Sequence, residues 1–313
     1  MKKVLISAPY MIPEVERFRN IFEENGIEII IAEVKERLCE DELLQYTKEI
    51  DGVICGDDKF TGKVISSSPR LKVISKWGTG IDSIDVSECE KHGIKIFRTT
   101  NAFSEPVADT VWGSILCFAR QIIWMDREIK GLKWKKLTLR ALNECVLGIV
   151  GVGDCGKAVA RRAKAFGTRL MGNDIKQIPE KFIEETGISM VSPKQLLEES
   201  DYISINTDLN PSSYHLMAKE QFSAMKRTAV LINTSRGDVV DEKALIEALD
   251  KGLIYGAALD VFEEEPIRPD NPLLKMSNVI LSPHNANSSP VAREKVHVNT
   301  INNLIKNLKE EES

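Results

Sequence analysis

The sequence lacks any apolar run near the ~20 residues that a membrane-spanning helix needs, and its six cysteines show no C-x-x-C spacing. Several of these cysteines lie in apolar runs, which favours buried, reduced thiols over disulfides or a metal site. The first apolar stretch, Val4 to Tyr10, is too short for a secretory signal. These absences predict a cytoplasmic protein with no membrane contact, structural disulfide or bound metal.

Strong charge of either sign is also missing. The 42 basic and 47 acidic residues are interspersed and give a net charge of -5, which argues against a nucleic-acid-binding surface. There is no internal repeat, low-complexity segment or Gly/Ser-rich linker. A chain of 313 residues is long enough for two domains, each with its own core.

Short apolar runs alternate with amphipathic stretches through residues 1–100, which predicts a parallel sheet covered by helices on both faces. The expected strands are Val4–Ile6, Ile27–Ile31, Gly52–Cys55, Leu71–Ile74 and Ile94–Phe97. The expected helices are Pro13–Asn25, Asp41–Ile50, Gly62–Ser67 and Val86–His92. No glycine fingerprint occurs here, so this part is not the obvious nucleotide-binding domain.

A long helix is expected from Ser104 to about Lys130, and strand–helix alternation then resumes. About six parallel strands follow, the number in a complete doubly wound dinucleotide-binding domain. They are Val146–Val150, Arg169–Met171, Tyr202–Ile205, Val230–Asn233, Ala257–Val261 and Val279–Leu281. A last helix, Ser289 to Leu308, precedes a charged tail, Lys309 to Ser313. Its length suggests that it returns to pack on the first domain, which would then be discontinuous.

The stretch Leu147 to Gly156 predicts a buried strand, a glycine turn and the start of a helix. Gly151, Gly153 and Gly156 have the G-x-G-x-x-G spacing of a dinucleotide site. The first glycine permits the tight turn, the second lets the backbone approach a pyrophosphate, and the third lets the helix pack on the strand. The anion then lies at the positive end of the helix.

Asp174 supplies the acidic partner that such a site needs. It follows the expected strand Arg169–Met171 by a few residues and stands 18 positions after Gly156, where a carboxylate binds the adenosine ribose hydroxyls. A carboxylate there repels a 2′-phosphate, which favours NAD over NADP, although the nearby cation Lys176 leaves the strictness open. The alternative is an ordinary turn or cap aspartate.

Three further polar residues follow three different expected strands: Arg236, Glu265 and His284. Ligands of open α/β sheets bind outside the carboxyl ends of the strands, so all three belong to the rim that carries the glycine turn. Histidine suits proton exchange with a hydroxyl or carbonyl oxygen near neutral pH, and a carboxylate fixes its tautomer. A planar guanidinium binds a substrate carboxylate. Taken singly, each is an ordinary loop residue, so the functional interpretation depends on all three.

With these residues, nearly the whole chain resembles the D-isomer-specific 2-hydroxyacid dehydrogenase family, which includes D-3-phosphoglycerate dehydrogenase. Gly151-Val152-Gly153-Asp154-Cys155-Gly156 matches the family's cofactor turn, and Leu231 to Gly237 matches its catalytic-Arg segment. Gly256 to Pro266 and Ser282-Pro283-His284 match the segments with the catalytic Glu and His. The resemblance implies an NAD-dependent enzyme in which Thr207, Thr234, Ser235 and Asp260 also contact the cofactor.

The first domain matches as well. Lys76-Trp77-Gly78-Thr79-Gly80 resembles the loop that binds the substrate carboxylate, and Asn101 resembles the hinge. The resemblance implies a Rossmann NAD-binding domain, 101–286, inserted into a flavodoxin-like substrate domain, 1–100 plus 287–313. The expected reaction interconverts a small D-2-hydroxy acid and its 2-oxo acid.

The chain departs from the family at Asp208, where Pro is frequent, and at Asp109, where Glu is usual. Phosphoglycerate-specific members carry an Arg near Cys55, which this chain lacks, so whether its substrate is phosphorylated stays open. Lys59 and Lys76 are candidate anion contacts. Two alternatives on the same scaffold are an NAD(H)-sensing binding protein with little turnover and an oxidoreductase for formate or phosphite.

The family also implies a homodimer. The long helix from Ser104 would supply the interface through its large apolar residues, which are Trp112, Phe118, Ile122, Ile123 and Trp124. The alternative is an ordinary helix in the core of one chain.

Overall fold

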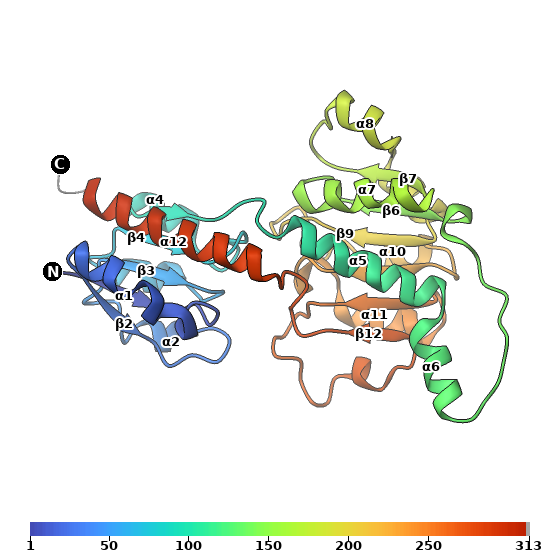
Figure 1. The fold of residues 1–313 in the computed structure, drawn as a ribbon, viewed down its shortest axis with the longest axis horizontal. Coiled ribbons are helices and arrows are strands. Elements are labelled where there is room, and N and C mark those ends of the chain that lie inside the picture. Colours follow the sequence, from blue (N-terminus) through green and yellow to red (C-terminus); the bar gives the residue numbers. More distant parts are fainter. Residues whose placement is uncertain (311–313) are drawn as a thin grey trace. The chain divides into compact units, whose positions relative to one another are not determined.

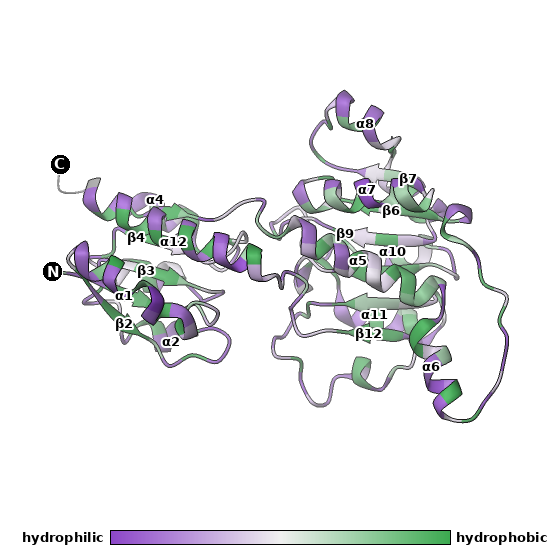
Figure 2. Ribbon diagram, in the orientation of Figure 1, coloured by the Kyte–Doolittle hydropathy of each residue, from purple (hydrophilic) through white to green (hydrophobic). Residues whose placement is uncertain are grey.

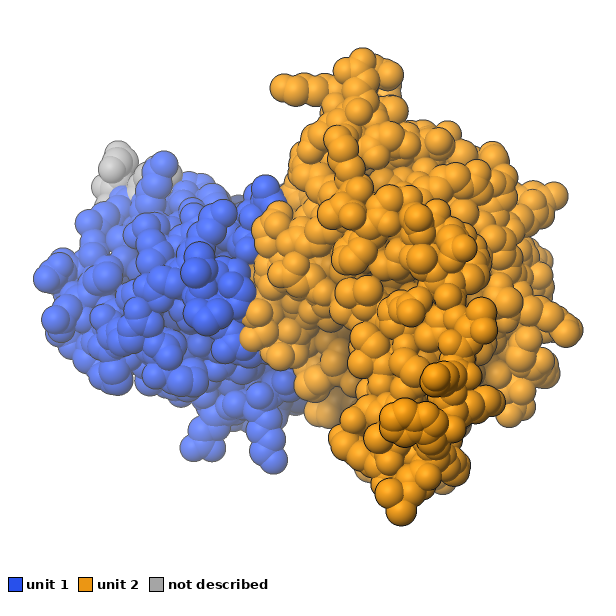
Figure 3. All heavy atoms as spheres, turned by 45° about the vertical axis from the view of Figure 1, so that its right-hand side comes forward, with its two compact units in different colours: residues 1–102, 289–313 blue, residues 103–288 orange. Residues whose placement is uncertain are grey.

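The computed structural model describes residues 1–310, which form two compact units. Unit 1 contains residues 1–102 and the chain from 289 onward, and unit 2 contains residues 103–288 (Figure 3). Of the expected charged tail, Lys309 and Glu310 end the last helix, and residues 311–313 lie outside the described part of the chain.

Unit 1 is built on a parallel sheet with the strand order β2-β1-β3-β4-β5. Its strands are β1 (Lys2–Ile6), β2 (Ile27–Ile31), β3 (Gly52–Cys55), β4 (Val73–Lys76) and β5 (Lys95–Phe97). Its helices are η1 (Ile12–Glu14), α1 (Val15–Glu24), α2 (Glu40–Leu43), α3 (Gly62–Ser66), α4 (Val86–Lys91) and α12 (Pro290–Glu310).

Both faces of this sheet are covered, so its central strands are buried throughout. One face packs on a core that includes Leu5, Val53 and Ile74. The other face carries α12, which contacts β3, β4 and β5 (Figure 1). The close approach of α12 depends on Gly52, because a Cβ there would lie 2.9 Å from Leu304 Cδ1.

Unit 2 is built on seven parallel strands in the order β12-β11-β10-β9-β6-β7-β8. These are β6 (Val146–Val150), β7 (Arg169–Asn173), β8 (Ser189–Met190), β9 (Tyr202–Ile205), β10 (Val230–Asn233), β11 (Gly256–Leu259) and β12 (Val279–Leu281). The helices are α5 (Ser104–Ala119), α6 (Ile122–Lys130), η2 (Leu142–Glu144), α7 (Asp154–Phe166), α8 (Glu180–Thr186), α9 (Pro193–Glu199), α10 (Lys219–Ala224), η3 (Gly237–Val239), α11 (Glu242–Asp250) and η4 (Pro272–Lys275).

Alternating residues of each strand in unit 2 point into two different cores. Val230 and Ile232 of β10 pack on the side of α5 and α7, whereas Leu231 packs on the side of α9, α10 and α11. This alternation follows from the two-residue period of a strand. Figure 2 shows the consequence, since the strands are largely hydrophobic while the surface helices alternate between hydrophobic and hydrophilic residues.

The predicted fold class, two parallel-sheet α/β domains, is confirmed. Two details of the second domain were wrong. The second sheet has a seventh strand, β8, which is only two residues long and therefore leaves no periodic signal. The helix expected from Ser104 to Lys130 is broken, because Gln121 adopts a left-handed conformation with φ of 51° and its side chain donates to Phe118 O.

The break at Gln121 divides the apolar residues of this region. Trp112 and Phe118 belong to the core of unit 2, whereas Ile122 is half exposed. Trp124 packs on Phe118 and donates its indole N–H to Ser277 O. Among residues 1–310, no helix is long and apolar enough to cross a membrane, and no group of metal-ligating side chains is found. All six cysteines are free thiols.

One buried histidine of unit 1 is held in its neutral form. His297 on α12 is 3% exposed, and the indole N–H of Trp77 donates to its Nδ1 at 3.0 Å. Because an indole nitrogen only donates, Nδ1 must accept and carries no proton. Burial is the main cause that lowers the pKa of His297 from its ordinary value of 6.5, and the nearby cations Arg17 and Arg293 act in the same direction against Glu294 and Glu14.

We therefore expect the stability of the protein to fall as the pH drops below 6.5. The unfolded chain binds a proton on His297 before the folded protein does, so acidification favours unfolding by at most about 1.4 kcal/mol per pH unit. Urea midpoints at pH 7.5 and 5.5 measure this effect. His297→Gln, which keeps an acceptor for Trp77, should lose less stability over this interval than the wild type. His92→Gln, on the surface of α4, should behave like the wild type. Equal pH dependence in all three proteins would contradict this assignment.

Candidate active site

The glycine turn lies between β6 and α7, as its sequence predicts. Gly151 has a φ of +85°, and a Cβ there would lie 2.9 Å from the backbone of Asn206. A Cβ on Gly156 would lie 2.1 Å from Gly151 O, so α7 packs directly on the turn. Gly153, the N-cap residue of α7, has open space beside it. The turn is therefore tight on the protein side and open where a phosphate approaches the N-terminus of α7.

Asp174 lies beside this turn, directly after β7. Its Oδ2 accepts the backbone N–H of Val152 at 2.7 Å, and its Oδ1 accepts that of Lys176 at 2.7 Å. These two bonds fix the half-buried carboxylate against the glycine turn. Each oxygen keeps a second lone pair, so the carboxylate retains the capacity to accept from the hydroxyls of a ribose.

Two other expected cofactor contacts have unsatisfied groups. The side-chain hydroxyls of Thr207, after β9, and Thr234, after β10, are buried without a partner among the described residues. Buried hydroxyls are normally hydrogen-bonded, so these two retain the capacity to bond a group with polar atoms. Ser235 differs, because its hydroxyl donates to Asn233 Oδ1 at 2.8 Å. Together with the open space at Gly153, these residues fit NAD.

Asp154 and Cys155, which separate the last two glycines, begin α7. The Asp154 side chain is exposed, and Cys155 is partly buried. Burial is the main cause that raises the pKa of the Cys155 thiol above its ordinary value. The thiol is therefore neutral and adds no negative charge at the end of the helix where a pyrophosphate is expected.

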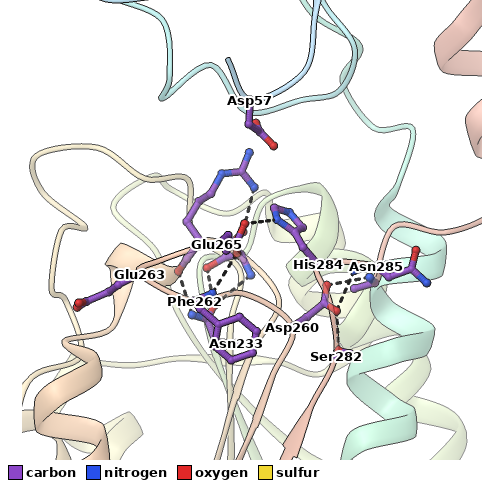
Figure 4. A network of polar contacts seen from close by, with 12 residues as sticks. Asp57, Asn233, Asp260, Phe262, Glu263, Glu265, Ser282, His284 and Asn285 are labelled. Carbon is purple, nitrogen blue, oxygen red and sulfur yellow. Dashed lines mark hydrogen bonds and ion pairs between the residues drawn. The ribbon is translucent and has the colours of Figure 1, made fainter. Parts of the chain in front are cut away.

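His284 and Glu265 form a direct pair after β12 and β11 (Figure 4). The distance from His284 Nδ1 to Glu265 Oε2 is 2.9 Å, and both side chains are mostly buried. The other oxygen, Glu265 Oε1, accepts the backbone N–H of Phe262 at 3.0 Å. The carboxylate is therefore fixed by its own loop, and it orients the imidazole through Nδ1.

The turn that carries His284 is fastened to Asp260, which is 3% exposed. Asp260 Oδ1 accepts from Ser282 Oγ at 2.5 Å and from Asn285 N at 3.0 Å, and Oδ2 accepts from Ala286 N at 2.8 Å (Figure 4). The backbone N–H of His284 also donates to Asp260 O at 2.7 Å. Asp260 thus positions this turn, and its contact with the cofactor stays a prediction.

A second histidine–glutamate pair holds the loop of Glu265 from its other side. His215 Nε2 lies 3.0 Å from Glu263 Oε1, which also accepts the backbone N–H of Glu242 at the start of α11. A lone loop histidine such as His215 offers no signal of this contact in the sequence. The Glu263-Glu264-Glu265 run is therefore partly fixed by the protein and is more than a solvated acidic stretch.

Arg236 follows β10 in extended backbone, and Asn233 determines its path. The Asn233 amide donates to Arg236 O at 2.9 Å, and its Oδ1 accepts from Ser235 N at 3.0 Å. Gly237 is packed against the next loop, since a Cβ there would lie 1.9 Å from Phe262 O. This contact keeps the arginine segment beside the loop that carries Glu265.

Apart from Arg236, the expected substrate contacts lie in unit 1, at or after the end of β4. Lys76 is 2% exposed and its Nζ lies 2.6 Å from Asp57 Oδ1. Gly78 has a φ of +133°, and the Thr79 hydroxyl donates to Thr99 O at 2.7 Å. Gly80 is partly buried in the same loop, and Asn101, at the end of unit 1, has a φ of 50°.

Sequence reasoning missed Asn233 and Ser282 as positioning residues. Asn233 is the last residue of the buried strand β10, and Ser282 follows the partly buried strand β12, two residues before His284. That placement is the one signal available in the sequence, and it is weak because strand ends are commonly polar. Their partners, Arg236 and Asp260, become apparent only when the strands are paired.

Comparison with known proteins identifies the family of this chain. The profile described as "D-isomer specific 2-hydroxyacid dehydrogenase, NAD binding domain" matches residues 112–286. A glyoxylate reductase of Korarchaeum cryptofilum is 41% identical over 271 residues, which is 84% of this chain and 81% of that protein. The D-3-phosphoglycerate dehydrogenase of Methanocaldococcus jannaschii is 37% identical over 94% of this chain and 55% of its own length.

Among solved structures, D-lactate dehydrogenase from Aquifex aeolicus in complex with NAD and lactic acid is similar. Its TM-score is 0.89 at 27% identity, and the match covers 99% of this chain and 96% of that chain. The predictions of family, of NAD as cofactor and of a dehydrogenase are confirmed. The chain belongs to the D-isomer-specific 2-hydroxyacid dehydrogenase family of NAD-dependent enzymes.

Proposed function

We propose that the protein reduces a small 2-oxo acid to the D-2-hydroxy acid, and catalyses the reverse oxidation, with His284 as the acid and base. The observation that carries this proposal is the 2.9 Å contact between His284 Nδ1 and Glu265 Oε2. With the Nδ1 proton directed to Glu265, the proton exchanged with the substrate oxygen is carried on Nε2. The carboxylate stabilises the imidazolium, and deprotonation returns the ring to the tautomer in which Nε2 is a base.

Arg236 binds the carboxylate of the substrate. Its guanidinium has the planar donor geometry that matches a carboxylate, and a cation near the carbonyl polarises it. Support comes from the backbone around it, because Asn233 and Gly237 hold the arginine segment beside the loop of Glu265. A cation held in position contributes more to substrate binding and catalysis than a mobile one, because it needs no reorientation when the substrate binds.

The cofactor is bound by the carboxyl edge of the second sheet. Gly151, Gly153 and Gly156, with the backbone of Asp154 and Cys155, hold the pyrophosphate, and Asp174 accepts from the adenosine ribose. The buried hydroxyls of Thr207 and Thr234 acquire their partners from it, and Ser235 and Asp260 complete its surroundings. Bound NADH supplies the hydride equivalent that reduces the carbonyl carbon. Asp174 disfavours a 2′-phosphate, so NADH is preferred over NADPH.

A surface arm of unit 2 supports the proposal of a homodimer. After α6 the chain runs without helix or strand from Leu132 to Ala141 (Figure 1). Leu132 is 94% exposed and Trp134 is 84% exposed, and Ile122 and Ile129 of α6 are half exposed. Several large apolar side chains exposed on consecutive segments of the chain suit an interface better than a single exposed residue does. We place the interface on this arm and on α6 rather than on Trp112 and Phe118, which lie in the core.

The cytoplasm is the proposed compartment. All six cysteines are free thiols, and Cys55 and Cys89 are buried. Unpaired cysteines in this number suit a reducing environment.

The function is tested with a panel of 2-oxo acids (glyoxylate, pyruvate, hydroxypyruvate, phosphohydroxypyruvate and branched acids) by NADH and NADPH absorbance. We expect turnover with NADH.

His284→Ala should lower kcat by about 10²- to 10⁴-fold and leave NADH affinity largely unchanged, because the histidine acts on the proton. His92→Ala serves as the control. A His284→Ala enzyme with near-wild-type kcat would rule out the role of this residue, and NADH binding without turnover across the panel would indicate a sensor.

Gly237→Ala should impair both folding and catalysis. The added methyl group lies 1.9 Å from Phe262 O, so the arginine segment must move away from the loop of Glu265. We expect a loss of about 1–3 kcal/mol in the free energy of unfolding and a lower kcat/KM. Gly113→Ala on the exposed face of α5, where nothing lies within 4 Å, should gain about 0.5–1 kcal/mol. Urea titration and steady-state kinetics measure both variants, and wild-type kcat/KM in Gly237→Ala would refute this positioning role.

The dimer is tested by size-exclusion chromatography with light scattering. The wild type should have twice the chain mass of 35.1 kDa. Trp134→Asp places a charge in the proposed interface and should shift the mass toward that of one chain. Val291→Asp, at an equally exposed apolar position on α12, should remain dimeric. A monomeric wild type, or a Trp134→Asp variant as dimeric as the control, would remove this arm from the interface.

A further inference from the structure

A single carboxylate in unit 2 joins the two ends of the loop that carries Glu265. Glu242 is the first residue of α11, and its two oxygens accept from two different places in that loop. Oε2 accepts the backbone N–H of Glu263 at 3.3 Å, and Oε1 accepts from Asn271 Nδ2 at 2.7 Å. Glu265 lies between these two anchor points in the chain. The carboxylate of Glu242 therefore spans the loop from residue 263 to residue 271.

The contact at the first end of the loop is reciprocal. The backbone N–H of Glu242 donates to Glu263 Oε1 at 3.0 Å, so each glutamate accepts from the main chain of the other. That N–H belongs to the first turn of α11, where the N–H groups have no partner within the helix and carboxylates are favoured. The Glu263 side chain points away from His284 (Figure 4). The contact therefore keeps a second carboxylate away from the pair of His284 and Glu265.

At the second end of the loop, the side chain of Asn271 is fixed through both of its polar atoms. Its Oδ1 accepts the backbone N–H of Leu273 in η4 at 2.9 Å, while its Nδ2 donates to Glu242. Between the two ends, Ile267 is partly buried against the core of unit 2. The position of the loop relative to α11 therefore depends on Glu242 at both ends and on Ile267 between them.

The same helix continues the segment that carries Arg236. Gly237 is packed on the Glu265 loop, since a Cβ there would lie 1.9 Å from Phe262 O. A few residues later the chain reaches Glu242, which bonds to the next residue of that loop, Glu263. The segment with the cation and the loop with the carboxylate are thus fastened to each other at two successive points, and both belong to unit 2.

We propose that Glu242 is a positioning residue that holds the Glu265 carboxylate within hydrogen-bonding distance of His284. The proposal rests on the function proposed above, in which His284 exchanges the proton. The contact from His284 Nδ1 to Glu265 Oε2 is 2.9 Å, so a small movement of the loop breaks it. A displaced Glu265 stabilises the imidazolium less, and the ring then loses its proton at lower pH. Glu242 acts through Glu265 and is not itself a catalytic residue.

Glu242→Ala removes both acceptors and tests the proposal. The kcat for reduction should fall by about tenfold, with a smaller change in KM, because the loss concerns the alignment of the proton donor. The titration of the His284 ring, followed by NMR and identified by comparison with His284→Ala, should move to lower pH by about 0.5 unit or more. A merely structural role would lower the stability but leave kcat and this titration unchanged in the folded enzyme.

Two further variants calibrate the effect. Glu242→Gln keeps one oxygen, which accepts from one end of the loop, while its amide group meets a second donor. Its kcat and His284 titration should lie between those of the wild type and Glu242→Ala. Glu247→Gln is the matched control, because Glu247 lies on the same helix and pairs with Lys251 at 3.0 Å. It removes the same charge outside the loop contacts and should retain the wild-type kcat and titration.

The outcomes separate this inference from the proposed function. A folded Glu242→Ala enzyme with the kcat and His284 titration of the wild type overturns the inference and leaves the function standing. Urea unfolding and NADH affinity show whether the variant is folded. If it is not, Glu242→Gln and Asn271→Ala, which each release one end of the loop, decide by the same two readouts. If the wild type reduces none of the 2-oxo acids, the proposed function fails, and the His284 titration still decides whether Glu242 positions Glu265.

Discussion

Parallel pairing of β10, β11 and β12 is the constraint on which the site depends. Asn233 pairs in register with Leu259, and Leu259 pairs with Leu281. Residues that follow these three strands therefore emerge at one edge of the sheet, although they are far apart in the sequence. The contact of Asp260 with Ser282, and that of Glu265 with His284, both follow from this register. A shift of one residue in the pairing of β11 with β12 would move both contacts.

The site is rigid because backbone groups and carboxylates hold it. Glu265 is fixed by Phe262 N, and Asp260 is fixed by three donors of the turn after β12. Gly237 and Phe262 are in direct backbone contact, so a side chain cannot be inserted between the loops. Such preorganisation lowers the cost of aligning the reacting groups when a substrate binds.

The sequence predicted the elements with strong patterns. The strands Gly52–Cys55 and Val146–Val150 have the predicted bounds, because each is a short apolar run with clear ends. The strand expected at Leu71–Ile74 is instead Val73–Lys76, since the charged residue at its end is buried. Lys76 is the informative case. A lysine is hydrophilic, so its hydropathy predicts that it lies outside a buried strand. In the structure the pairing of β3 with β4 brings Asp57 close enough to balance its charge.

Some residues of the candidate site could be predicted from the sequence and others could not. Arg236, Glu265 and His284 were predicted, because a family resemblance identifies residues whose types and order are preserved. Asn233 and His215 were missed, because their contribution is a contact with another segment: Asn233 holds Arg236, and His215 holds Glu263. A sequence pattern can identify a residue type at a position, but it does not show which distant residue will contact it. That contact depends on how the strands are arranged in the sheet.

His284 shows how the structure maintains an unfavourable conformation where the chemistry is proposed. Its φ of 48° lies in the left-handed region, which is uncommon for residues other than glycine and costs about 1–3 kcal/mol. The cost is offset locally, since the carboxylate of Asp260 accepts from Ser282, Asn285 and Ala286 and its carbonyl accepts from His284. Charge-assisted bonds to a buried carboxylate are among the stronger hydrogen bonds of a protein. The imidazole therefore reaches Glu265 from a backbone conformation that its own residue type disfavours, and Asp260 makes that conformation stable.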